Sequence, residues 1–231
     1  MNMNSMEHNR QVYNQIADHF SQTRALLWDD LKDLKHYAFP GARILDIGCG
    51  NGRLYQMFDD LSIAYTGIDQ SENLIAHAKK KFPQAQFEVG NMIALPFADH
   101  SFDRIYAIAS FHHLPTEDLR LQALQEMKRV LVPGGKIIMT NWNAQSNWAQ
   151  KKIGKGDWQI GEQGNDHLLV PWKNNQAEVQ GVREYWLLTP EGLEQLAVSV
   201  GLIVEKQYFV SRGEEVPLHR GMNIVSIFTC P

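Results

Sequence analysis

Two acidic residues and three glycines have the spacing of a site for a polar ligand. Asp46 interrupts a short apolar run, and Gly48, Gly50 and Gly52 follow it at every second position. Glycine adopts positive φ and lets a ligand approach the backbone. A helix after such a turn offers its free N–H groups to an acceptor. Asp69 ends a second apolar run and can accept two hydrogen bonds from ribose hydroxyls.

The position of the first acid separates this pattern from a dinucleotide site. A dinucleotide fold expects G-x-G-x-x-G, with the pyrophosphate on the helix N-terminus. Here the order is Asp-x-Gly-x-Gly-x-Gly, and a buried acid at Asp46 would repel a pyrophosphate. It suits a ligand that carries an ammonium group and hydroxyls. An amino-acid end joined to a ribose describes S-adenosylmethionine (SAM). The alternative is a structural strand–turn–helix that binds no ligand.

The motif Asp46-Ile-Gly-Cys-Gly-Asn-Gly52, followed by Gly67-Ile-Asp69, resembles the class I SAM-dependent methyltransferases. The later stretches FDRIYAIASFHHL and RVLVPGGKII resemble the same family. This resemblance implies methyl transfer, with SAM as cofactor and S-adenosylhomocysteine as product. The residues that we expect to bind the cofactor are Tyr13, Phe20, Arg24, Asp46, Gly48, Cys49, Gly50, Asn51, Asp69, Gln70, Asn91, Met92 and Ala109.

The predicted cofactor contacts differ in their chemistry. Arg24 can pair with the methionine carboxylate through a charge-assisted bond. Tyr13 and Phe20 either cover the ligand or pack in the core. Asn91 stands where the family often carries an acid that accepts from the adenine amino group, and its amide oxygen can still accept that bond. Met92 can pack on the adenine face.

Two adjacent histidines are the candidate general bases. His112 and His113 follow the predicted fourth strand, at the end that faces the cofactor. An amine, phenol or carbon acceptor often needs a base, whereas a carboxylate is already ionised at pH 7. The alternative roles for this pair are helix capping, pocket shaping and ring packing. The histidines are scattered and no Cys/His ligand spacing appears, so we predict no metal site.

Further motifs resemble the tRNA wobble-uridine carboxymethyl methyltransferases, which esterify a carboxymethyl group on uridine. These motifs are the stretch from Tyr13 to Arg24 with Trp28, then His112-His113, Asn141-Trp142, Leu169-Val-Pro-Trp172 and Arg183-Glu-Tyr-Trp186. The resemblance implies that Arg183 or Tyr185 holds the substrate carboxylate. It also implies phosphate contacts by Lys151, Lys152 and Lys155 and, as in eukaryotic members, a small partner protein. The alternatives are a methyltransferase for a small metabolite, namely a quinone precursor or carboxylic acid, and a non-catalytic SAM-binding protein.

The elements that must position these residues form one α/β domain. We expect a Rossmann-like seven-stranded sheet, mostly parallel with the last strand antiparallel, and helices on both faces. The expected parts of this single domain, residues 1–231, are a helical lid over 1–40, a SAM-binding core over 41–142, an insertion near the substrate mouth over 143–188, and a C-terminal helix and strand pair over 189–231.

Composition excludes several classes of protein. The net charge is −4 and the pI about 6.1, so the bulk charge gives no support to a large nucleic-acid footprint. Two cysteines do not make a disulfide framework. No apolar run approaches the roughly 20 residues of a membrane span, and the N-terminus has no signal-peptide pattern. We therefore expect a soluble cytoplasmic protein that does not contact membranes.

Overall fold

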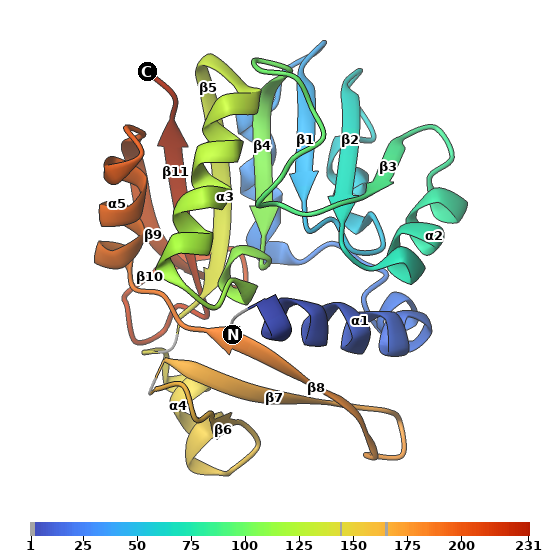
Figure 1. The fold of residues 1–231 in the computed structure, drawn as a ribbon, viewed down its shortest axis with the longest axis vertical. Helices are drawn as coiled ribbons and strands as arrows, with labels where there is room; N and C mark the ends of the chain where they lie inside the picture. Colours follow the sequence, from blue (N-terminus) through green and yellow to red (C-terminus); the bar gives the residue numbers. More distant parts are fainter. Residues whose placement is uncertain (1–2, 144, 165) are drawn as a thin grey trace.

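A computed structural model describes residues 3–143, 145–164 and 166–231. Its main sheet has eight strands in the order β10-β9-β11-β5-β4-β1-β2-β3 (Figure 1). The strands are β1 (Arg43–Ile47), β2 (Ala64–Asp69), β3 (Gln86–Val89), β4 (Phe102–Ile108), β5 (Leu131–Trp142), β9 (Ile203–Ser211), β10 (Glu214–Val216) and β11 (Asn223–Thr229).

The strand directions confirm the predicted α/β class but not the strand number. Strands β1 to β5 are parallel, and β11 runs antiparallel to both β5 and β9, as expected for the last strand. The expected count of seven is wrong for this sheet because β9 turns back as β10 and adds an edge strand. Residues 1–2, 144 and 165, which fall in the predicted lid and insertion, lie outside the described residues.

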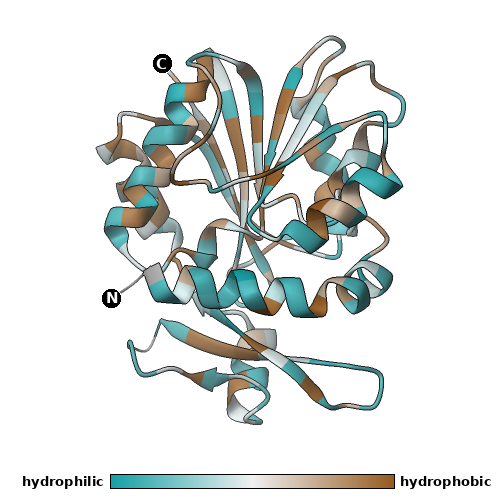
Figure 2. Cartoon of the chain, turned by 45° about the vertical axis from the view of Figure 1, so that its right-hand side comes forward, coloured by the Kyte–Doolittle hydropathy of each residue, from teal (hydrophilic) through white to brown (hydrophobic). Residues whose placement is uncertain are grey.

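Helical segments cover both faces of the sheet. One face packs α3 (Glu117–Val130) and α5 (Pro190–Ser199), and the other packs α2 (Glu72–Lys81), η1 (Asp29–Tyr37) and η2 (Arg53–Phe58). The apolar strands between these layers lie in the centre of the molecule in Figure 2. Ser71 and Thr189 cap α2 and α5, with hydroxyl oxygens that accept from the N–H groups of Leu74 and Gly192. The segments η1 and η2 are 3-10 rather than α-helical.

The segment 143–188, expected as an insertion near the substrate mouth, contains its own small sheet. This roof sheet consists of β6 (Gln159–Ile160), β7 (His167–Lys173) and β8 (Val179–Trp186), all antiparallel, and α4 (Asn147–Gly154) packs with it. Figure 1 shows the roof sheet below the main sheet, beyond the carboxyl ends of the parallel strands.

Helix α1 (Met3–Thr23) lies between the two sheets (Figure 1). On one side, Val12 packs closely against Gly181 of β8. A Cβ atom added to Gly181 would lie 2.7 Å from a methyl group of Val12. On the other side, Oδ1 of Asn14 accepts from the hydroxyl of Ser71 at 2.6 Å. Helix α1 therefore connects the roof sheet to the main sheet. None of the described helices has the length and hydropathy to cross a membrane.

Candidate active site

A cavity of about 950 Å³ lies between the carboxyl ends of β1, β2 and β4 on one side and α1 and the roof sheet on the other. Parallel α/β sheets bind ligands at this edge. The cavity is lined by every predicted catalytic and cofactor-binding residue except Asn91. The lining also includes residues that the sequence reading did not assign, among them Asn9, Arg53, Ser110, Trp148 and Trp158.

Positive φ angles and, at Gly48, a close contact disfavour larger side chains in the glycine loop. Gly48 and Gly50 have φ values of +72° and +54°, which L side chains rarely adopt. A Cβ on Gly48 would lie 2.3 Å from the Cβ of Ser110, and one on Gly50 would lie 3.7 Å from the ring of Phe20. The loop therefore presents bare backbone to the cavity, with Phe20 above it.

Asp69 ties this loop to the next strand. Its Oδ2 accepts from the N–H of Gly50 at 2.9 Å, and its Oδ1 accepts from the N–H of Ser71 at 2.8 Å. Burial raises the pKa of Asp69, and these two backbone N–H groups lower it. A carboxylate oxygen can accept more than one bond, so each oxygen retains capacity for a ligand hydroxyl.

Asp46 is buried below the loop. The hydroxyl of Tyr65 donates to its Oδ2 at 2.5 Å. Burial raises the pKa of Asp46 to about 7, although the bond from Tyr65 lowers it. Beside it, Cys49 is a buried free thiol, and Asn51 donates from its Nδ2 to the carbonyl oxygen of Arg24 at 3.2 Å. This bond joins the glycine loop to the segment after α1.

Three guanidinium groups face the cavity over aromatic rings. Arg53 lies 3.8 Å from the ring centroid of Trp28, while Arg24 and Arg183 lie 5.1 Å and 4.8 Å from that of Trp172. Among the described residues, no carboxylate oxygen lies within 4.0 Å of any of the three groups. The sequence alone gave no reason to place Arg53 here, although it follows the glycine motif directly.

A hydrogen-bonded chain of two phenols and one imidazole borders Arg183. Nδ1 of His113 lies 2.9 Å from the carbonyl oxygen of Glu184 and must donate to it, so Nε2 accepts from the hydroxyl of Tyr13 at 3.0 Å. The hydroxyls of Tyr13 and Tyr185 are 3.4 Å apart. Burial lowers the pKa of His113 to about 4, so the ring is neutral near pH 7. Both of its ring nitrogens are thus engaged in hydrogen bonds within the protein.

His112 is also buried and neutral. Its Nδ1 accepts from the backbone N–H of Trp142 at 3.2 Å. Burial lowers the pKa of His112 well below its ordinary range, and His113 lowers it further. The structure therefore brings the two predicted bases to the cavity in their uncharged form. Whether either residue acts as a base stays a prediction.

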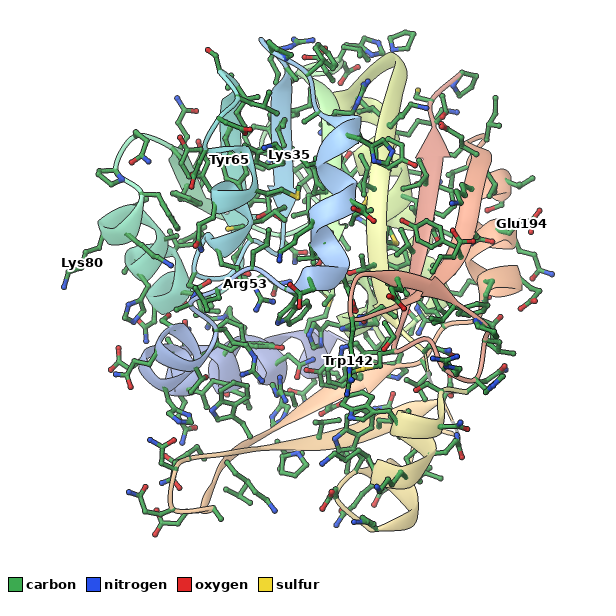
Figure 3. The ribbon with its side chains drawn as sticks, turned by 180° about the vertical axis from the view of Figure 1, so that it is seen from behind. Lys35, Arg53, Tyr65, Lys80, Trp142 and Glu194 are labelled. Atoms are coloured by element: carbon green, nitrogen blue, oxygen red, sulfur yellow. The ribbon has the colours of Figure 1, made fainter. Side chains whose placement is uncertain are left out.

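An aromatic wall closes the substrate side of the cavity. Trp142 is stacked between Tyr185 and Trp158. Its ring centroid lies 4.2 Å from that of Tyr185, with an interplanar angle of 10°, and 4.9 Å from that of Trp158, with an angle of 3°. Trp148 meets Trp158 edge-on at 4.8 Å. In Figure 3, Arg53 and Trp142 both lie in the band between the main sheet and the roof sheet. Trp148 and Trp158 come from the segment whose structure the sequence reading missed.

Of four other residues predicted to contact substrate or cofactor, only one lines the cavity. Lys152 lines the cavity, with Nζ 3.0 Å from a carboxylate oxygen of Asp157, whereas Lys151 and Lys155 are exposed beside it. Asn91 does not line the cavity, and its Oδ1 accepts from the N–H of Ile93 at 3.1 Å. That oxygen is thus already engaged within its own turn. Within the described part of the chain, no group of three or more His, Cys, Asp or Glu side chains could hold a metal ion.

Comparison with known proteins finds methyltransferase relatives. Residues 45–139 match the protein family described as "Methyltransferase domain". A tRNA (carboxymethyluridine(34)-5-O)-methyltransferase of Schizosaccharomyces pombe is 34% identical over 166 residues, which are 72% of this chain and 68% of that protein. The Mus musculus tRNA (carboxymethyluridine(34)-5-O)-methyltransferase ALKBH8 is 32% identical over 227 residues, 92% of this chain but 32% of that protein. The chain spans about a third or less of the length of ALKBH8 from mouse, Xenopus tropicalis and Macaca fascicularis.

Solved structures share the fold. The PH0226 protein of Pyrococcus horikoshii OT3 superimposes with a TM-score of 0.68 at 24% identity, over 88% of this chain and 89% of that one. A structure of the complex between the Haloferax volcanii Trm112 methyltransferase activator and a methyltransferase gives a TM-score of 0.67 at 17% identity, over 96% and 97%. At these identities the likeness shows the fold alone.

Proposed function

Since this chain belongs to the SAM-dependent methyltransferase family that includes the tRNA carboxymethyluridine methyltransferases, we propose that it methylates the carboxylate of a carboxymethyl group on the wobble uridine of tRNA. The observation that carries this proposal is the guanidinium of Arg183. It is buried in the cavity among aromatic rings, and its Nε has no hydrogen-bond partner among the described residues.

The residues on the other side of the cavity fit SAM. Asp69, Arg24 and the glycine loop all line the cavity, and we propose that Asp69 accepts from the ribose hydroxyls, that the loop backbone admits close approach and that Arg24 pairs with the methionine carboxylate. When bound, SAM supplies an electrophilic methyl group on a sulfonium. The protein then needs to hold the acceptor in line and exclude water.

A carboxylate acceptor fits the electrostatics of the site. A buried charge without a partner is strongly destabilising, and a guanidinium binds a carboxylate through two parallel bonds. The acceptor carboxylate is therefore expected to bind Arg183, beside Tyr185. Because a carboxylate is ionised at pH 7, no base has to remove a proton. This agrees with a site whose histidines, His112 and His113, are buried, neutral and hydrogen-bonded.

Cations at the mouth favour tRNA over a small metabolite. Lys152, Lys173 and Arg212 line the cavity from three different segments, and Lys151 and Lys155 are exposed on and beside α4. These groups are placed to contact phosphates, which makes binding salt-dependent. A small carboxylic acid shares the Arg183 site but needs none of these outer cations. We also propose a small activator protein of the Trm112 kind as a partner, on the strength of the family resemblance.

Product analysis tests the proposal. The protein is incubated with methyl-labelled SAM and tRNA that carries 5-carboxymethyluridine, with and without a Trm112-type protein, and in parallel with a small-molecule extract. We expect label in tRNA that mild alkali releases, as from a methyl ester, and none in tRNA transcribed without the carboxymethyl group. Label only in the small-molecule fraction would replace tRNA by a metabolite. Binding of S-adenosylhomocysteine without label in any sample would support the non-catalytic alternative.

A further inference from the structure

The three guanidinium groups of the cavity exceed the two carboxylates that the proposed reaction brings to it. Arg24 and Arg183 share the ring of Trp172, at 5.1 Å and 4.8 Å from its centroid, and Arg53 stacks on Trp28 at 3.8 Å. A cation–π contact stabilises a guanidinium but gives its N–H groups no acceptor. Nη1 of Arg53 and Nε of Arg183 are buried and lack hydrogen-bond partners among the described residues.

Arg24 interacts with both of the other groups, because it shares the ring of Trp172 with Arg183 and lines the same cavity as Arg53, whose pKa it lowers. Burial lowers the pKa of Arg53, and the positive charge of Arg24 lowers it further, to about 10. Burial likewise lowers the pKa of Arg24, and the positive charge of Arg183 lowers it further. Burial also lowers the pKa of Arg183, but the side chains of Tyr185 and Tyr13 raise it above its ordinary value, so the repulsion lowers the pKa of Arg24 and Arg53 and not that of Arg183. Three like charges in one cavity repel one another, and this repulsion decreases when anions bind between them.

We infer that Arg24 is shared by two carboxylates, the methionine carboxylate between Arg53 and Arg24 and the acceptor carboxylate between Arg24 and Arg183. This inference rests on the proposed function. It assigns Arg53 a positioning role toward the cofactor. It also makes the two ligands bind cooperatively, because the shared cation offsets the repulsion between their negative charges.

The reaction itself removes this coupling. A carboxylate oxygen forms the new O–C bond with the methyl carbon, and the electron pair of the C–S bond remains on sulfur. No proton and no third reactant are required. The acceptor becomes a neutral ester, which no longer binds Arg183 and Arg24 as an anion. The product therefore leaves more readily than the substrate, while the methionine carboxylate stays paired.

Calorimetry with S-adenosylhomocysteine tests the coupling. The affinity is measured alone, with saturating 5-carboxymethyluridine, and with its neutral amide analogue 5-carbamoylmethyluridine. We expect the acid to tighten binding roughly 5- to 150-fold, the usual range for coupled sites, and the amide to have no such effect. Equal effects of the acid and the amide, or no effect of the acid, would overturn the inference.

Replacing Arg24 should reverse the sign of the coupling between the acid and S-adenosylhomocysteine. In Arg24→Met the two carboxylates face each other without the central charge, so the acid should weaken S-adenosylhomocysteine binding. Arg24→Lys should keep part of the positive coupling. Arg10→Met is the matched control, since Arg10 lies on α1, which ends just before Arg24, and lines the same cavity but is paired with Glu7 and Glu72. Positive coupling that persists in Arg24→Met would contradict a shared cation.

A second series with acetate separates this inference from the proposed function. Acetate carries the carboxylate without the nucleoside. If acetate tightens S-adenosylhomocysteine binding through Arg24 but tRNA receives no methyl ester, the inference stands and the proposed function fails. If tRNA receives the ester but neither acid affects the affinity in any variant, the proposed function stands and the inference fails.

Discussion

The side-chain amide of Asn9 binds both backbone groups of Glu184. Its Nδ2 donates to the carbonyl oxygen at 2.8 Å, and its Oδ1 accepts from the N–H at 2.8 Å. The same carbonyl oxygen accepts from Nδ1 of His113. One asparagine thus joins α1, the roof sheet and the segment after β4, and it fixes the strand that carries Arg183 and Tyr185.

Replacing Asn9 by alanine should therefore destabilise the protein. The change removes two hydrogen bonds and leaves a half-buried N–H of Glu184 without its Asn9 acceptor, which we expect to lower the free energy of unfolding by about 2 kcal/mol. Urea denaturation measures this value. Gln11→Ala is the control, because Gln11 is exposed on the same helix and bonds only to Glu7. Equal stability of the two variants would show that the α1–β8 junction tolerates the loss.

Asp69→Ala should abolish cofactor binding. The carboxylate holds the N–H of Gly50 and is the predicted acceptor for the ribose hydroxyls. Loss of charge-assisted bonds of this kind corresponds to a roughly 100- to 1,000-fold lower affinity for S-adenosylhomocysteine, measured by calorimetry. Asp59→Ala, at an exposed position outside the cavity, should bind normally. Unchanged affinity in Asp69→Ala would remove the ribose assignment.

Arg183→Met should separate catalysis from cofactor binding. We expect kcat/KM on the acceptor to fall by a factor of about 100 or more, because a buried guanidinium–carboxylate pair is lost. The affinity for S-adenosylhomocysteine alone should remain. Arg183→Lys should recover only part of the activity, since an ammonium group cannot form the two parallel bonds. Arg220→Met, at an exposed site outside the cavity, serves as the control, and full activity in Arg183→Met would contradict the assignment.

The buried imidazole of His113 predicts how stability depends on pH. Its pKa is about 4 in the folded protein, against 6.5 ordinarily. Between these values the unfolded chain takes up a proton that the native protein does not, so stability is full above about pH 6.5 and falls as the pH decreases. The expected loss is about 3 kcal/mol by pH 4. His112 acts in the same direction.

Denaturation between pH 4 and 8 checks this sign. His113→Gln should show a flatter dependence than the unmodified protein, whereas His219→Gln, at an exposed position, should follow the unmodified protein. A dependence that is unchanged in His113→Gln would mean that other groups cause the acid lability.

The features that are local in the chain were predictable from the sequence. The glycine loop, Asp69 and the capped helices depend on neighbouring residues, so their spacing indicates them. The roof sheet depends on pairing between β7 and β8 and on contact with α1, none of which a local pattern shows. Asn91 was assigned by its place after β3, and its adenine contact stays a prediction, because its oxygen accepts from the N–H of Ile93 but keeps a second lone pair. Arg53 was missed because only the folded chain places Trp28 beneath it.

The tryptophans give the molecule an intrinsic optical reporter. Five of the six, Trp28, Trp142, Trp148, Trp158 and Trp172, line the cavity. The sixth, Trp186, stacks instead on His167. The indole rings of Trp142 and Trp158 are nearly parallel at 4.9 Å, a geometry in which their electronic transitions couple. Emission intensity and near-ultraviolet circular dichroism should therefore report occupancy of the cavity directly, so that binding can be followed in real time without attaching a dye.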